Sequence, residues 1–353
     1  RMLALAEAFV GWMRGGVAIV GLTSCAVFTA FTGASGVTII ALGGLLYPML
    51  RKQNYSENFS LGLLTCTGSL GLMFPPSLPI ILYGLVAGQL DPRVSIDKLF
   101  IAGAVPVLLL VLALCVYSAV VGARTSEKPK RFDLKDLKQA ARAAKWEIPL
   151  PFVVVGGIYG GLFTATDAAA VMAFYVLVAE VFIYRDVKLK DLPKIVCESM
   201  ALVGAILIVL GCALGLTNYM IDAEIPERLF AALQAWGSSK VLFLIVLNIL
   251  LLVINMVEIF SAIIIVVPII IPIAAQYGID PIHLGIIFLL NLEIGYMTPP
   301  LGLNLFLSNR RFNKPLFTLY RATFPFWLIH IAMLILVTYI PSLSLWLLSV
   351  LGK

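Results

Sequence analysis

Long apolar runs separated by short charged loops make up most of this 353-residue chain. Three predominantly apolar runs, residues 100–121, 193–216 and 241–257, are near or above the roughly 20 residues with which an α-helix crosses a bilayer. Hydrophobic residues account for 61% of the chain and charged residues for only 12%, about half the usual charged fraction of a soluble domain. The pattern predicts an all-α polytopic membrane protein.

Two of the apolar runs are interrupted by the same element, a Pro-Pro pair. The pair Pro75-Pro76 follows Gly-Leu-Met-Phe, and the pair Pro299-Pro300 follows Gly-Tyr-Met-Thr. Two consecutive prolines open a helix, because each lacks a backbone donor and clashes with the preceding turn. Opened backbone survives at membrane depth only inside protein or beside a wet cavity, where it can hold ions. We therefore expect broken helices over residues 59–89 and 283–307.

The distribution of basic residues predicts the orientation of the chain. Residues 123–147 carry eight basic and four acidic residues, so we expect a cytoplasmic loop with an amphipathic helix on anionic lipid. Basic residues also gather at 51–52, 185–194 and 310–321, and these four loops hold 18 of the 25 lysines and arginines. The net charge of +6 is therefore explained by basic residues in cytoplasmic loops, and no nucleic-acid partner is expected.

Placing every basic loop in the cytoplasm predicts two re-entrant hairpins that enter from opposite sides, over residues 14–50 and 240–275. A constant offset of 224 relates Pro48, Gly71, Met73 and the first proline pair to their later counterparts. Together these observations predict an inverted-topology repeat. The first repeat spans residues 1–122 and ends with a helix over 99–121. Residues 148–220 form connecting and scaffold helices, and the second repeat, residues 221–353, contains a helix over 322–341.

The hairpin tips and the proline breaks contain the polar residues suited to binding small solutes. Hydroxyls, amides and freed carbonyls are ligands for a hard alkali cation, whereas polar groups near half-helix N-termini suit a carboxylate. Small residues at a tip are equally typical of close helix packing, and a proline pair can also be a simple kink. The candidate cation ligands are Gly33, Ser35, Thr38, Gly68, Asn255, Glu258, Gly295 and Gly302. The candidate substrate-binding residues are Ser69, Ser77, Thr298 and Asn304.

Other chemistry has little support in the sequence. The five cysteines lie in apolar runs without a Cys-Xaa-Xaa-Cys pair, and no phosphate-binding loop or hydrolase motif is present, so we predict neither an enzyme nor a bound cofactor. The two histidines, His283 and His330, are expected to be interfacial or packed. Among the acids, Glu293 at membrane depth is a candidate functional group, whereas Asp167 is at least as well explained as a helix N-cap.

Three long motifs resemble those of the large membrane subunit of tripartite ATP-independent periplasmic (TRAP) transporters. They are GSLGLMFPPSLPI at 68–80, GIYGGLFTATDAAA at 157–170 and NLEIGYMTPPLGLNLF at 291–306. The resemblance covers nearly the whole chain, but the first helices of the family look missing, and we expect the natural protein to begin upstream. Three positions depart from the common pattern: Ala34 replaces a serine in the first tip, Asp167 stands in place of a glutamate, and Glu258 stands where aspartate is frequent.

The resemblance implies an elevator-type carrier in the bacterial inner membrane that imports an organic acid, such as a C4-dicarboxylate, another carboxylate or a sialic acid. Sodium is the implied coupling ion, held at the hairpin tips and breaks. The implied partners are a small four-helix membrane subunit and a periplasmic substrate-binding protein. Two alternatives stay open from the sequence: a stand-alone sodium-driven carboxylate carrier that needs no binding protein, and a membrane scaffold without transport activity.

Overall fold

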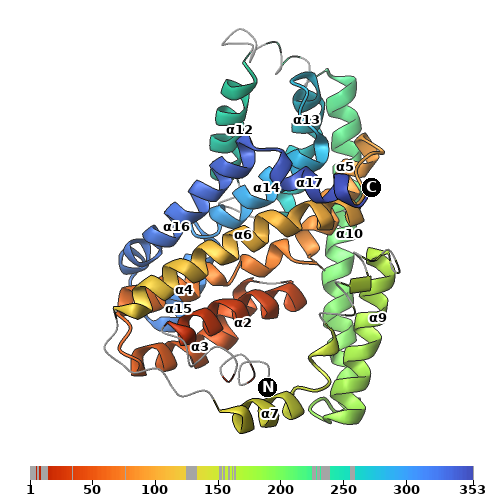
Figure 1. Cartoon of the computed structure of the whole chain (residues 1–353). Coiled ribbons are helices and arrows are strands. Elements are labelled where there is room, and N and C mark those ends of the chain that lie inside the picture. Colours follow the sequence, from red (N-terminus) through yellow and green to blue (C-terminus); the bar gives the residue numbers. More distant parts are fainter. Residues whose placement is uncertain are drawn as a thin grey trace.

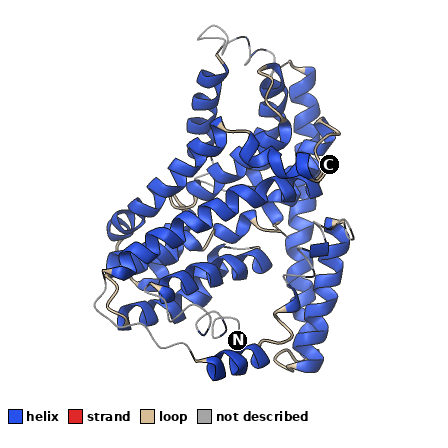
Figure 2. Cartoon of the chain, viewed as in Figure 1, coloured by secondary structure: helices blue, strands red, loops and turns tan. Residues whose placement is uncertain are grey.

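The computed structural model is helical throughout the residues that it describes (Figure 2). The described segments are residues 15–33, 35–75, 77–124, 133–150, 164–224, 239–254 and 259–352, together with positions 5, 8, 153, 156, 157, 160, 162, 228 and 231. Within these segments no strand is found, which confirms the all-α class. Three helices are long and apolar enough to cross a membrane, and a bent helix pair makes a fourth candidate.

The N-terminal part begins with two apolar helices joined by a very short turn. Helix α2 spans Gly16–Thr32 and helix α3 spans Ser35–Lys52, with Pro48 inside α3. Gly33 caps α2 with a left-handed backbone (φ +65°), and its N–H donates to the Thr29 carbonyl at 2.8 Å. Glycine suits this position because residues with a side chain rarely adopt positive φ. The turn therefore lies within the expected hairpin tip.

The next segment is a helix interrupted at the first proline pair. Helix α4 (Glu57–Thr67) is followed by a 3₁₀ turn, η1 (Leu70–Met73), and then by α5 (Leu78–Leu90). The two arms are bent by 41° relative to each other. Helix α6 then runs unbroken over Ile96–Ala123 and is the longest of the three single helices that could cross a membrane in the described part of the chain. Two proline residues in succession thus coincide with a real break, whereas the single Pro106 inside α6 is accommodated within a continuous helix.

In the described parts of the middle of the chain lie one short polar helix and two longer apolar ones. Helix α7 (Leu134–Ala143) lies in the basic segment, and α9 (Ala165–Leu177) continues into a π-helical turn, η2 (Val178–Ile183). The short 3₁₀ turn η3 (Leu189–Asp191) precedes α10 (Leu192–Asp222), the long green helix of Figure 1. Thr164, not Asp167, is the N-cap of α9. Asp167 instead completes a capping box by accepting from the Thr164 N–H at 3.2 Å.

Six helices are described between residues 239 and 352. They are α12 (Lys240–Ile254), α13 (Ile259–Gln276), α14 (Pro281–Gly295), α15 (Leu303–Phe312), α16 (Leu316–Tyr339) and α17 (Ser342–Val350). The second proline pair lies in the break between α14 and α15, and the Pro299–Pro300 peptide bond is cis. Helix α16 begins six residues before the expected start at 322. The inverted relation between the two parts and the re-entrant path of the hairpins stay predictions.

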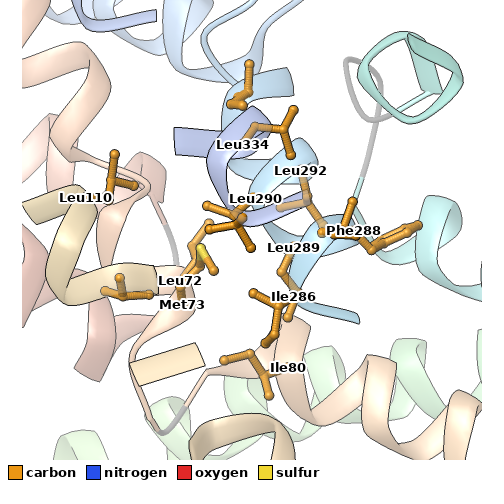
Figure 3. Packing of buried hydrophobic residues seen from close by; sticks show 14 of the residues in the cluster. Leu72, Met73, Ile80, Leu110, Ile286, Phe288, Leu289, Leu290, Leu292 and Leu334 are labelled. Carbon is orange, nitrogen blue, oxygen red and sulfur yellow. The ribbon is translucent and has the colours of Figure 1, made fainter. Parts of the chain in front are cut away.

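The core is formed where the two parts of the chain meet. Helix α4 packs against α16, α5 against α13, and α14 against α6 and α12. Every residue of α14 is buried, and its apolar side chains meet Leu72 and Met73 of η1, Ile80 of α5 and Leu334 of α16 (Figure 3). In contrast, Phe174 of α9 and Ile208 of α10 are each 71% exposed. An outward apolar surface of this kind is what a lipid environment requires.

Candidate functional site

The first candidate site forms where α2 and α3 meet the break after α4. The hydroxyls of Thr29 and Thr38 lie 2.6 Å apart, and the Thr29 hydroxyl donates to the Gly68 carbonyl at 2.9 Å. Because Thr29 donates to Gly68, Thr38 supplies the proton of the hydroxyl pair. Both threonines are fully buried, and Ser35 is 4% exposed. A buried chain of hydrogen bonds, from the Thr38 hydroxyl through the Thr29 hydroxyl to the Gly68 carbonyl, therefore joins the hairpin to the broken helix.

Close backbone approach is what makes this arrangement possible. A Cβ added to Gly71 would lie 2.3 Å from the Ala26 carbonyl oxygen and 2.3 Å from the Ala30 nitrogen. A Cβ on Gly68 would meet the Ile39 side chain at 2.7 Å and the Ser35 carbonyl oxygen at 3.3 Å. Real Cβ atoms are essentially never found 2.3 Å from backbone, so Gly71 lets η1 lie directly on α2, and Gly68 allows a close approach to Ile39 and Ser35 of α3.

The two predicted substrate-binding serines beside the first break bond to their own segment. Ser69 donates to the Cys66 carbonyl at 3.2 Å, and Ser77 donates to the Leu72 carbonyl. Both side chains are buried. Ser77 precedes α5 but makes no side-chain cap to it, so the first amides of α5 are not satisfied by this hydroxyl. These serines satisfy carbonyls freed by the break, while their oxygen lone pairs can still accept hydrogen bonds.

Asn304 connects the second break to the first. Its Nδ2 donates to the Thr65 carbonyl at 3.1 Å, and the Thr65 hydroxyl donates to Ser308 at 2.8 Å. Helices α4 and α15 are thus joined by polar bonds across more than 230 residues of sequence. The Asn304 Oδ1 is buried and has no hydrogen-bond partner among the described residues. It is therefore an acceptor oxygen available at the start of a half-helix.

The second break itself is a tight polar turn. The Gly302 N–H donates to the Thr298 carbonyl at 2.9 Å, and a Cβ at Gly302 would lie 2.5 Å from the Tyr296 carbonyl oxygen. The Thr298 hydroxyl donates to the Ile294 carbonyl and accepts from the Trp327 indole at 3.0 Å. Gly295 accepts from the Thr298 N–H at 3.2 Å. The turn therefore holds these groups in one fixed geometry.

The structure brings some of the predicted residues together and separates others. Ser35, Thr38 and Gly68 lie in one buried cluster, and Gly33 closes the same turn. Gly295, Thr298 and Gly302 share the second turn, and Asn304 reaches from there to α4. Ser69 and Ser77 lie in the first break without a hydrogen bond to either cluster in the described part of the chain. The predicted ligands Asn255 and Glu258 lie outside the described residues.

Sequence reasoning missed two polar contributors, Thr29 and Asn248, and did not foresee the partner of a third, His330. Thr29 is the centre of the first cluster, but in the sequence it is one hydroxyl in an ordinary apolar helix. Asn248 of α12 accepts from Asn291 of α14 at 2.7 Å, and a lone asparagine in the middle of an apolar run was the available signal. His330 was expected to be interfacial or packed; it is buried, with Nε2 3.8 Å from the carboxylate of Glu293.

Among the described residues no group of three histidine, cysteine, aspartate or glutamate side chains could hold a metal ion. The oxygens at the two breaks are mostly hydroxyl, amide and carbonyl groups, which bind alkali cations without burying several negative charges. The arrangement therefore suits a weakly held monovalent cation better than a transition metal.

The family model and the related proteins agree on the same kind of transporter component. Residues 1–343 match the family described as "Tripartite ATP-independent periplasmic transporter, DctM component". A C4-dicarboxylate TRAP transporter large permease protein from Pseudomonas aeruginosa is 39% identical over 348 residues, covering 98% of this chain and 80% of that protein. An isethionate TRAP transporter permease protein, DctMQ, from Oleidesulfovibrio alaskensis is 35% identical over 348 residues, covering 98% of this chain and 54% of that protein.

A solved structure shares the fold. The YdaH transporter of Alcanivorax borkumensis superimposes with a TM-score of 0.63, covering 98% of this chain and 85% of that one. The two sequences are only 15% identical, so the likeness concerns the architecture alone.

Proposed function

Because the chain belongs to the DctM family of tripartite ATP-independent periplasmic transporter components, we propose that it is the large membrane subunit of a sodium-coupled organic-acid importer. Its substrate is a C4-dicarboxylate, another carboxylate or a sialic acid, and its location is the bacterial inner membrane. A periplasmic substrate-binding protein delivers the substrate, and a small four-helix membrane subunit completes the complex. The name of the Pseudomonas aeruginosa relative, which specifies C4-dicarboxylate, supports a carboxylate, and the name of the Oleidesulfovibrio alaskensis relative specifies isethionate, a sulfonate and thus another organic anion.

The observation that carries the proposal is the pair of buried polar breaks that are bonded to each other. Thr29, Thr38 and Gly68 surround one break, and Asn304 links the other break to Thr65. Buried oxygens in an otherwise apolar core cost free energy unless they serve a ligand or are fully bonded. A sodium ion at the oxygen cluster and a substrate carboxylate near the half-helix N-termini would use these groups together.

An elevator mechanism follows from the same arrangement as part of the proposal. The hairpin α2–α3, the broken helices and α15 form a connected unit through the bonds around Gly68 and Asn304. Helices α9 and α10 have mostly exposed apolar side chains and supply a candidate scaffold. A transport unit that slides against this scaffold would carry the sodium and the substrate as one body.

The test is uptake into liposomes that contain the purified complex of the large and small subunits. We expect uptake of labelled succinate only when an inward sodium gradient and the matching binding protein are both present. Replacing sodium by choline should remove uptake, and omitting the binding protein should do the same. Uptake of free substrate without the binding protein would instead support the stand-alone carrier. Sodium-independent uptake would contradict the proposal.

A further inference from the structure

The outward face of α16 is an apolar stripe that contains a single charge. Along this helix the exposed positions recur mainly every three or four residues, so they form one continuous face. Four large apolar side chains on this face, Phe317, Phe324, Leu328 and Ile335, are between 47% and 64% exposed. Arg321 lies on the same face and is the only lysine, arginine, aspartate or glutamate of the helix. The opposite side of α16 is buried against α4 and α14.

Hydrogen bonds on one flank of α16 fix the rotation that directs Arg321 outward. The Tyr320 hydroxyl donates to the Pro300 carbonyl at 3.2 Å, and the Trp327 indole donates to the Thr298 hydroxyl at 3.0 Å. Tyr320 and Trp327 are seven residues apart, so they lie on one side of the helix and attach it to the second proline break. Arg321 is thereby held on the outer side of a helix that is bonded to the candidate functional site.

The length of α16 places Arg321 at the level of the lipid headgroups. A helix of 24 residues is about 36 Å long, which exceeds the hydrocarbon core of about 30 Å by roughly one turn. Arg321 ends a segment, residues 310–321, that carries four basic residues and no acid. The charge distribution predicted a loop here, but the structure places Arg321 in the second turn of the helix. An arginine side chain near a helix end extends to the phosphate layer, while the apolar stripe beyond it contacts acyl chains.

The guanidinium of Arg321 is positioned to bind an anion. Its central carbon lies 4.8 Å from the centre of the exposed Phe317 ring. A guanidinium above an aromatic ring is attracted to the ring face and can still donate through its edge, where paired N–H groups match the oxygens of a phosphate. We propose that the outer face of α16 binds an anionic phospholipid, with Arg321 on the phosphate and with Phe324 and Leu328 along an acyl chain.

Charge favours an anionic lipid over other occupants of this face. Arg310 and Arg311 are exposed at the end of α15, which is joined to α16 by residues 313–315. Basic side chains near the membrane surface attract anionic lipids. A two-fold contact between copies of the chain through this face would instead place two Arg321 side chains at the same depth, where they repel each other.

Native mass spectrometry of the purified protein tests the headgroup preference, with phosphatidylglycerol and phosphatidylethanolamine that carry identical acyl chains. We expect phosphatidylglycerol to bind at least about fivefold more tightly, the factor that one basic residue contributes at an anionic surface. Arg321→Gln should lose this preference. The matched control Arg93→Gln removes an exposed arginine that pairs with Asp91, and it should keep the preference. No preference in the unmodified protein, or an equal preference in Arg321→Gln, would overturn the proposal.

A second measurement uses only the unmodified protein, so it does not depend on the folding of a variant. Phosphatidylglycerol with a photoreactive group in its acyl chain is cross-linked to the protein in phosphatidylcholine vesicles, and peptide mass spectrometry locates the adducts. We expect adducts on Phe324 and Leu328 that unlabelled phosphatidylglycerol suppresses at least about fivefold more than unlabelled phosphatidylethanolamine does. Adducts on the exposed side chains of Met200, Val203 and Leu207 of α10 should be suppressed equally by both lipids.

Three outcomes of the cross-linking would overturn the assignment. Equal suppression on α16 by the two lipids would show that this face contacts bulk lipid without preference. Cross-links between two copies through α16 would assign the face to a second copy of the chain. Loss of the α16 adducts when the small membrane subunit is added would assign the face to that partner. Neither measurement involves sodium or uptake, so its failure leaves the proposed transport function unaffected.

Discussion

The break between α4 and α5 and the break between α14 and α15 contain similar residues, but their buried polar atoms differ in hydrogen bonding. At the first break, Thr29, Thr38 and Gly68 satisfy one another. On α14 and α15, the Oδ1 atoms of Asn291 and Asn304 and both oxygens of Glu293 have no partner within the described structure. The Thr29–Thr38–Gly68 cluster is thus already bonded internally, so that a sodium ion there would bind the remaining lone pairs of these oxygens, whereas the second break keeps buried unbonded acceptors for an ion or a substrate.

This difference predicts which substitutions should reduce stability and which should reduce transport. A bonded buried oxygen contributes modestly to stability, but an unbonded one costs about 1–3 kcal/mol. Changes at the first break should therefore affect folding strongly, and changes at the second should affect transport with less effect on folding. The following variants test this contrast, from the largest expected effect to the smallest.

The largest effect is expected for Gly71→Val. The new Cβ would lie 2.3 Å from two backbone atoms of α2, so η1 and α2 must separate. We expect destabilisation by more than about 3 kcal/mol and loss of monodisperse protein in size-exclusion chromatography. The control is Gly103→Ala, since a Cβ there has its nearest neighbours at 3.6 Å and should be tolerated. Normal folding of Gly71→Val would show that the close approach of η1 to α2 is not required.

Thr29→Val tests the bonding within the first cluster. It removes the donor to Gly68 and the partner of Thr38 while keeping the volume of the side chain. We expect a loss of about 1–3 kcal/mol, seen as a lower melting temperature. Thr23→Val on the same helix is the control, because Thr23 bonds only to carbonyls of its own helix. Equal melting temperatures for the two variants would argue against a structural role of the cluster.

Asn304→Leu tests the opposite expectation at the second break. It loses the bond to the Thr65 carbonyl but also removes the unpartnered Oδ1, so the two contributions partly cancel. We expect a stability change below about 1 kcal/mol together with a clear loss of uptake. Asn309→Leu on the same helix, where Asn309 bonds to the Lys314 carbonyl, should retain uptake. A large fall in stability with normal uptake would reverse the contrast between the two breaks.

The smallest effect is expected at the surface pair formed by Lys314 and Glu57, whose atoms Nζ and Oε1 lie 2.5 Å apart. The hydrogen bond to Glu57 raises the pKa of Lys314. A raised lysine pKa stabilises the fold below the ordinary lysine value of about 10.4, and this contribution is lost as pH rises through the folded-state value. Lys314→Gln should lower the melting temperature slightly at pH 8 and not at all at the highest pH. A larger effect in alkali would contradict this sign.

Much of the architecture could be predicted from the sequence because it depends on local properties of each segment. Apolar length predicts helices, and a Pro-Pro pair predicts a break, as seen after α4 and after α14. Glycine and hydroxyl residues between apolar runs located the tip at Gly33 and the cluster members Ser35, Thr38 and Gly68. Family motifs then identified the class of protein, which the comparisons confirm.

Contacts between distant segments could not be predicted in this way. Thr29 looks like any threonine of an apolar helix until α3 and η1 are packed against it. The pairing of Glu293 with His330 depends on the rotation of α16 about its axis, which an almost uniformly apolar helix does not specify in its sequence. For the same reason, the sequence indicated that Asn304 was polar and near a helix start, but not that it bonds to Thr65.

The most direct test of the account is the sodium dependence of uptake in the double variant Ser35→Ala/Asn304→Ala, which removes one side-chain oxygen from the hairpin tip that packs on the first break and one from the second break. The control pair is Thr23→Ala/Asn309→Ala, on the same two segments of the chain. If the two breaks together hold the coupling ion, the half-saturating sodium concentration should rise at least about tenfold in the double variant, at unchanged protein amount, and stay normal in the control. Identical sodium activation in all three proteins would contradict the account.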